Sequence, residues 1–298
     1  MTNRKFQGIN KLPTGADATG AWGIREAYFA SLDGDWPGPV PAQVYFLVVA
    51  GGAGGSSSLG GGGGAGGYRS AWNSETSGGG AGAETAITPI SGTAYTVTVG
   101  GGGGANSNGS PSTFASITST GGGRGGNNSP TSNPGSPGGS GGGGSAGSGP
   151  VGGSSGGSGT AGQGYAGGPA APNGGPGRCP SGGGGGAASG GETGTCYSSD
   201  RSQGGNGRAS TITGGSITRA QGGDGQGVPA GDARAPLGAN TGSGGRSSTT
   251  YDSGDSGVVV LRFAGPLPTV SAGLTYSTST SGSDYIYTFT SGSGTVLW

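Results

Sequence analysis

Side chains able to support catalysis or metal binding are scarce in this chain. Histidine, the commonest general base and metal ligand, is absent. The only two cysteines, Cys179 and Cys196, cannot by themselves complete a four-ligand zinc site. Asp252 and Asp255 could help to bind calcium, although carboxylates in loops are more often simply solvated. The residue types therefore predict a protein that is not an enzyme and that uses no cofactor or metal.

The same two cysteines could be joined by a disulfide or could remain as free thiols. A disulfide between Cys179 and Cys196 fits an oxidising exterior, where closing the loop would contribute about 3 kcal/mol. Assembly in a reducing bacterial cytosol would instead leave both side chains as thiols. The sequence leaves both states open.

Glycine dominates the composition and restricts the class of fold. The chain has 298 residues, of which 83 are glycine and 18 are proline, and only 28% are hydrophobic. A conventional side-chain core for the whole chain is therefore excluded. Because glycine loses the most entropy on folding, a disordered matrix protein is one alternative. Collagen is not, since the glycine blocks lack an uninterrupted three-residue period.

Charge and hydropathy exclude two kinds of partner. Thirteen basic residues balance thirteen acidic ones, and without a basic run no nucleic-acid binding is expected. No stretch approaches the roughly 20 apolar residues that span a bilayer, and the N-terminus lacks the apolar stretch of a secretory signal. We expect a protein that does not span a membrane and that reaches the outside of the cell by lysis.

Three regions follow one another along the chain. Residues 1–41 predict a short helix within 21–32 and a proline-rich connector after it. A helix of about three turns is marginal alone in water, so its aromatic side chains need a surface to pack on. The aromatic residues of this segment are Trp22, Tyr28, Phe29 and Trp36. They pack either on the protein's own body or, as an attachment segment, on another subunit.

Residues 42–264 predict a glycine-rich body that is interrupted by strands. Strands are expected over residues 43–49, 94–99, 112–117 and 257–263. Apolar residues alternate with threonine in the second of these, as in a half-buried strand, whereas Val258–Leu261 is continuously apolar, as in a strand buried on both faces. Because matching strands occur at both ends of the body, the sequence predicts a small sheet that frames it.

Residues 265–298 form the third region. The stretches Tyr285–Thr290 and Thr295–Trp298 predict the two strands of a β-hairpin, joined by a loop at Ser291–Gly294. This hairpin would complete either the sheet of its own chain or that of a neighbouring copy, the second by strand addition.

Four stretches of the body share their order of motifs with a known family. They run from Val44 to Gly55, from Gly60 to Tyr68, from Tyr95 to Gly104 and from Gly257 to Phe263. In this order the chain resembles the glycine-rich domain of bacteriophage tail-fibre proteins over about residues 42–264. The stretch 21–37 also resembles N-terminal modules of phage virion proteins.

The resemblance implies that the glycine runs form polyglycine II helices, packed side by side, with loops at one end that bind the host surface. Exposed aromatic and polar side chains would suit a surface glycan or an outer-membrane protein. The candidate recognition residues are Tyr68, Arg69, Trp72, Tyr165, Arg178, Tyr197 and Arg201. The other interpretation of each loop is a solvated connector.

Together these observations predict a mainly irregular, all-β fold: a polyglycine II bundle framed by a small sheet, with a short N-terminal helix and a C-terminal hairpin. The predicted function is a fibre or tail protein of a virion, extracellular after lysis, that contributes to host-surface recognition. It would contact other virion proteins through residues 1–41 and form a homo-oligomer, a trimer or a fibre. The alternative is a structural fibre, shaft or capsid-decoration protein without receptor specificity. Ice binding is disfavoured, because regularly spaced Thr or Ala is not seen.

Overall fold

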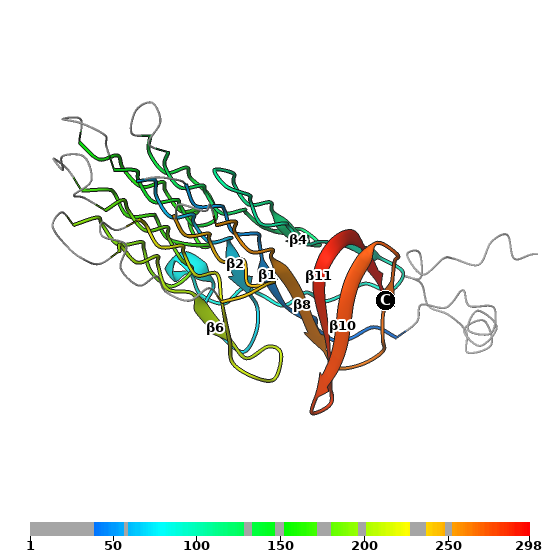
Figure 1. The fold of residues 1–298 in the computed structure, drawn as a ribbon. Coiled ribbons are helices and arrows are strands. Elements are labelled where there is room, and N and C mark those ends of the chain that lie inside the picture. Colours follow the sequence, from blue (N-terminus) through cyan, green and yellow to red (C-terminus); the bar gives the residue numbers. More distant parts are fainter. Residues whose placement is uncertain are drawn as a thin grey trace, which may run out of the picture.

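A computed structural model describes residues 39–56, 59–127, 133–146, 152–171, 180–195, 201–226, 237–247 and 252–298. These residues form an elongated molecule with a β-sheet at one end, from which glycine-rich segments run side by side to the other end (Figure 1). Within these ranges there are eleven strands and one short 3-10 turn, η1 at Gly78–Gly80, but no α-helix. A search of the same ranges finds no helix able to cross a membrane.

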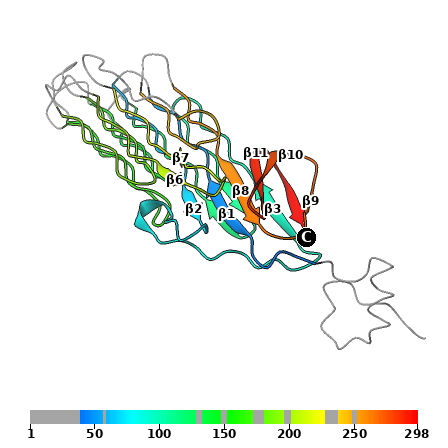
Figure 2. The same cartoon turned by 90° about the horizontal axis from the view of Figure 1, so that it is seen from below.

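Nine strands form one antiparallel sheet in the order β2-β1-β8-β11-β3-β4-β5, to which β9 and β10 add by pairing with β11. Their bounds are β1 Tyr45–Val49, β2 Tyr68–Ser70, β3 Ala94–Thr98, β4 Ser112–Phe114, β5 Ile117–Ser119, β8 Val258–Phe263, β9 Thr269–Val270, β10 Leu274–Ser281 and β11 Asp284–Leu297. The remaining strands, β6 at Arg208–Ser210 and β7 at Ile217–Arg219, form a separate hairpin. That hairpin lies beside β2 (Figure 2).

The sheet curls until its two end strands meet. The amide of Gly67, just before β2, donates to the carbonyl of Thr120, just after β5, at 2.8 Å. Arg69 Nη1 donates to the Thr118 carbonyl at 3.1 Å. The sheet is therefore nearly closed and barrel-like.

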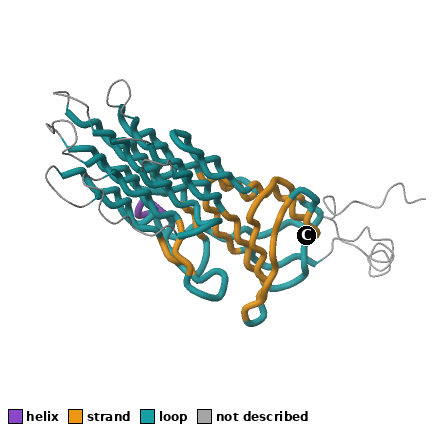
Figure 3. Tube along the Cα trace, in the orientation of Figure 1, coloured by secondary structure: helices purple, strands orange, loops and turns teal. Residues whose placement is uncertain are grey.

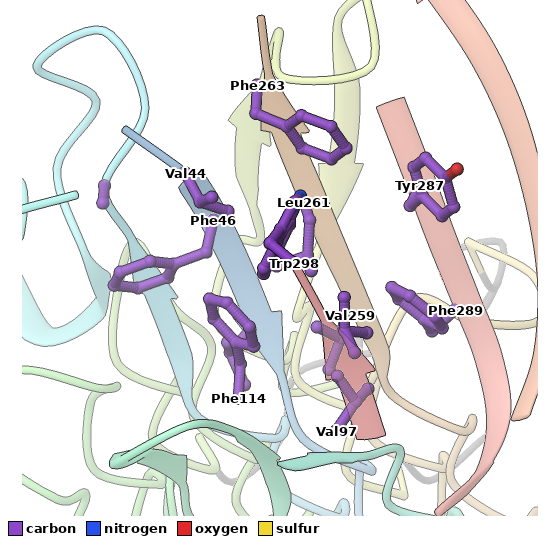
Figure 4. Packing of buried hydrophobic residues seen from close by; sticks show 13 residues of the cluster. Val44, Phe46, Val97, Phe114, Val259, Leu261, Phe263, Tyr287, Phe289 and Trp298 are labelled. Carbon is purple, nitrogen blue, oxygen red and sulfur yellow. The ribbon is translucent and has the colours of Figure 1, made fainter. Parts of the chain in front are cut away.

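Two apolar clusters bury the two faces of strands β1 and β8. Phe46, Val259 and Phe289 belong to the cluster inside the curl, where the Phe46 and Phe114 rings lie 6.0 Å apart (Figure 4). On the other face, side chains of both strands meet alanines of the glycine-rich body. This second cluster contains Leu47, Val49, Ala65, Tyr68, Ala187, Ile212, Ala220, Val258, Val260 and Ile286. The prediction that Val258–Leu261 is buried on both faces is confirmed.

The glycine-rich segments run side by side as the teal loops of Figure 3 and bond laterally through their backbones. In the segment 60–67, successive amides donate to different neighbours: Gly61 to Gly126, Gly62 to Gly182 and Gly63 to Gly245, and Gly64 returns to the first neighbour. The donor pattern therefore repeats every three residues. Carbonyls of the same segment accept hydrogen bonds from three further segments. The six neighbours are residues 50–56, 120–126, 140–143, 182–185, 222–225 and 242–245.

Close backbone approach explains why these segments are built from glycine. A Cβ on Gly63 would lie 2.2 Å from the Ala53 carbonyl oxygen, and one on Gly184 would lie 2.0 Å from the Gly63 oxygen. Neither distance is compatible with a side chain. Where alanine and serine do occur, as at Ala53 and Ser56, they are fully buried in the spaces that remain.

The predicted fold class is wrong. Where we expected a mainly irregular, all-β chain with only a small framing sheet, the described residues form an all-β fold organised by one nine-stranded antiparallel sheet. The sheet is large because β3, β4, β5 and the C-terminal strands join the two strands that flank the body. The helix expected within 21–32 lies outside the described residues.

The predicted position of the C-terminal hairpin turn is also wrong. Ser291–Gly294 is not a turn but the middle of the single long strand β11. Gly292 has φ +97 there, and the register of the β10 pairing shifts at Thr275/Tyr276, so β11 bends without ending. Its first half pairs with β8 and its second half with β3 of the same chain. The true hairpin turn follows Ser281, where Gly282 has φ +63.

Candidate functional site

The predicted recognition residue Tyr68 lies in the core. Its side chain is fully buried in the second apolar cluster. Burial raises the pKa of this phenol to about 12, and the neighbouring Glu75 carboxylate acts in the same direction. Tyr68 is therefore a structural residue that no ligand can reach.

Arg69 is held by an ion pair on the adjacent surface. Its Nε and Nη2 atoms donate to the two carboxylate oxygens of Glu84 at 2.6 and 2.7 Å. Such a two-point contact fixes the plane of the guanidinium. Nη1 is engaged by the Thr118 carbonyl, so Arg69 joins β2 to β5 rather than offering free donors.

Trp72 is half-buried and fully engaged within the chain. The Arg262 guanidinium lies 4.2 Å from the centre of its ring, and the Tyr45 ring meets it edge-on at 5.3 Å. Its Nε1 donates to Thr211 Oγ1 at 3.0 Å. Arg262 in turn donates to Asp284 at 2.9 Å. Trp72 therefore fastens the loop after β6 to the sheet.

The remaining predicted residues are not brought together with these. Tyr165 is half-buried in the body, where its backbone bonds to Gly141 and Gly186, and Arg201 Nη1 donates to the Ser247 carbonyl at 3.0 Å. The other predicted recognition, attachment and disulfide positions lie outside the described residues. They are Arg178, Tyr197, Trp22, Tyr28, Phe29, Trp36, Cys179 and Cys196.

A groove lies between three glycine-rich segments in the described part of the chain and is here called the Asp252 groove. It has a volume of about 260 Å³. Its lining consists of Gln221, Gly222, Gly223, Asp224, Ser243, Gly244, Gly245, Arg246, Asp252, Ser253 and Asp255. No aromatic side chain contributes, so the groove presents amide, hydroxyl and charged groups together with bare backbone.

The charged groups of the Asp252 groove are held in place by the segments that carry them. Arg246 Nε donates to Asp252 at 2.7 Å, and Thr241 Oγ1 donates to Asp255 at 3.0 Å. Burial raises the pKa of Asp255, and the Thr241 hydrogen bond partly opposes this effect. Asp224 is almost completely buried, and its carboxylate accepts a hydrogen bond from the Gly204 amide at 2.9 Å.

The lining of the groove is rich in hydrogen-bonding groups. Among the described residues no group of three His, Cys, Asp or Glu side chains is placed to hold a metal. Carboxylate, amide and guanidinium groups placed side by side can instead accept from and donate to sugar hydroxyls. The sequence signalled only the pair Asp252 and Asp255. Gln221 and Arg246 reach the groove only through the lateral packing of their segments, which the sequence does not reveal.

The geometry defines a class of protein. It is an all-β protein in which a curled sheet lies at one end of a set of glycine-rich segments that are hydrogen-bonded side by side. Within this class, the chain belongs to the glycine-rich domain family, whose model matches residues 32–264. No curated protein and no solved structure gives a significant match.

Proposed function

We propose that the protein is a fibre or tail component of a bacteriophage virion and contributes to recognition of the host surface. The observation that carries the proposal is the construction of the body, in which backbone bonds in several directions hold the segments and little side-chain core is required. Such a body is a rigid support for a small recognition surface. The order of glycine-rich motifs, which resembles that of tail-fibre proteins, supports the same assignment.

Within this proposal the Asp252 groove is the recognition site, and a bacterial surface polysaccharide is its ligand class. The groove is polar, and Arg246 and Asp252 are positioned by their own ion pair. Residues 1–41 would attach the protein to other virion proteins, and several copies would act together. The protein would then be extracellular once the host cell has lysed.

Binding of the purified protein to a panel of bacterial strains tests the proposal. We expect binding to some strains, competition by their soluble surface polysaccharide, and weaker binding by an Asp252→Asn variant. Asp284→Asn is the matched control, because it removes a similar ion pair, with Arg262, on the sheet. Equal loss of binding in both variants, or none in either, would contradict recognition in the groove.

A structural fibre, shaft or capsid-decoration protein is the second candidate function. It is favoured by the burial of Tyr68 and by the internal hydrogen bonds of Arg69 and Trp72, since these predicted recognition residues offer little to a receptor. Labelling the protein on purified particles by immuno-electron microscopy, together with no binding to any strain, would support this candidate over recognition.

A further inference from the structure

Strand β10 leaves a long edge of the sheet open. All eight residues of Leu274–Ser281 pair with β11, and no other described segment forms a backbone hydrogen bond with them. Alternate residues of an edge strand direct their N–H and C=O groups away from the sheet. Only two β10 carbonyls accept hydrogen bonds from described side chains, Thr275 from Thr290 and Ser281 from Arg262. As far as the described residues show, the edge therefore presents a row of backbone donors and acceptors that no other segment uses.

The other edges in the described part of the chain are short or closed. The end strands β2 and β5 meet each other through the Gly67–Thr120 hydrogen bond and the Arg69–Thr118 contact. Strand β9 has two residues, and β6 and β7 have three each. Strand β10 is thus the one edge in these ranges that is long enough to template a further strand.

Nothing in β10 guards this edge. Natural proteins protect exposed edges with charged residues, proline or a covering segment, whereas the sequence of β10 is Leu-Thr-Tyr-Ser-Thr-Ser-Thr-Ser. It contains neither charge nor proline, and residues 275–280 are all exposed. Threonine and tyrosine also favour the extended conformation. Strand β10 is therefore able to pair with a further strand, and it carries no charge that would repel one.

We propose that β10 pairs antiparallel with β10 of a second copy, so that one sheet continues across two molecules. An uncharged strand is complementary to itself, and pairing of identical strands satisfies the two-fold symmetry of a homodimer. With Thr278 on the two-fold axis, Tyr276 of one copy would lie opposite Thr280 of the other. Tyr276 is 43% exposed although it stacks on Tyr287 at 5.7 Å, and such cross-strand pairs stabilise a sheet. This pairing does not depend on host binding.

Charge exchange on β10 provides the test. Ser277 and Ser279 are exposed and lie on the face opposite Tyr276, so charges there should leave the fold intact. We expect the full chain to sediment as a dimer. The variants S277K/S279K and S277D/S279D should each sediment as monomers, with the dissociation constant raised about tenfold or more, because like charges would face each other. An equimolar mixture of the two should restore the dimer.

The control variant S107K/S216K carries the same added charge on exposed loops and should dimerise like the wild type. Circular dichroism of each variant checks that the strands persist, and recovery in the mixture excludes misfolding as the cause of dissociation. A wild-type chain that stays monomeric at its highest soluble concentration would overturn the proposal. So would charged variants that dimerise as well as the wild type, or a mixture that remains monomeric. Because the readout is sedimentation, failure here is distinct from failure to bind bacterial cells.

Discussion

Replacing Gly102 by alanine tests whether backbone approach dictates the glycine content. A Cβ on Gly102 would lie 1.9 Å from the Gly254 carbonyl oxygen, whereas a Cβ on Gly101 or Gly104 would meet nothing within 4 Å. None of the three residues has a positive φ, so alanine strains the backbone at none of them. One glycine run therefore contains both the perturbation and its matched controls.

The magnitude follows from what would have to move. Forcing a methyl group into packed structure costs about 1–3 kcal/mol. The Gly254 carbonyl cannot simply turn away, because the Asp255 amide of the same peptide unit donates to the Ser243 carbonyl at 2.8 Å and the Gly254 amide donates to the Gly103 carbonyl at 2.9 Å. Losing one such bond adds about 1 kcal/mol. We expect Gly102→Ala to lower the free energy of unfolding by about 3 kcal/mol.

The controls should behave in the opposite way. Gly101→Ala and Gly104→Ala reduce only the freedom of the unfolded chain, so each should be neutral or stabilising by about 0.4–1 kcal/mol. Thermal unfolding followed by circular dichroism measures the difference. The Gly102→Ala variant should melt about 6–12 °C below the wild type. Equal melting temperatures for all three variants, or equal losses in all three, would refute the explanation of the glycine content by backbone contact.

Two further predictions concern buried polar groups. Tyr68→Phe should leave the fold intact at neutral pH, because phenylalanine keeps the ring that fills the second apolar cluster. The folded pKa of Tyr68 is about 12, above the ordinary value of 10.0, so the wild type should lose up to about 3 kcal/mol as pH rises from 10 to 12. The Phe variant should lack that loss, and parallel alkaline melting curves would contradict the assignment. Arg262→Lys should cost about 2–3 kcal/mol, because lysine cannot reach Asp284 and the Ile212 carbonyl while covering the Trp72 ring. The control Arg246→Lys should cost less than about 1 kcal/mol, because the ion pair it alters is partly exposed, and similar melting temperatures for both variants would count against this view.

The strands could be predicted because their signals are local. Expected strands over 43–49, 94–99 and 257–263 appear as β1, β3 and β8, each marked by alternating or continuous apolar residues. The same reasoning failed at Ser291–Gly294, where Ser-Gly-Ser-Gly indicates a turn. Tertiary pairing overrides that local preference, because β8 and β3 hold the two halves of β11 in line.

The candidate site was less accessible to sequence reasoning. Its lining comes from three segments, around Asp224, Arg246 and Asp252, and their alignment depends on which glycine runs become neighbours. Runs of identical glycines contain no side-chain pattern that could encode such pairings. The sequence also did not indicate which aromatic residues are exposed: Tyr68 and Trp72 follow a glycine run, yet they pack inward where the body meets the sheet.

The glycine-rich body depends on the sheet for its stability. Each backbone bond contributes about 0.5–1.5 kcal/mol, whereas fixing one residue costs about 1–2 kcal/mol, so lateral bonding alone does not stabilise the segments. Additional stabilisation of the folded body comes from apolar burial, where Leu47, Val49 and Val260 of the sheet pack against Ala65 and Ala187 of the body. The pairing of β1 with β8 also brings the two ends of the body together, and the entropy cost of closing so long a loop grows only slowly with its length. The second apolar cluster thus allows the glycine-rich body, which has almost no side-chain core of its own, to remain ordered.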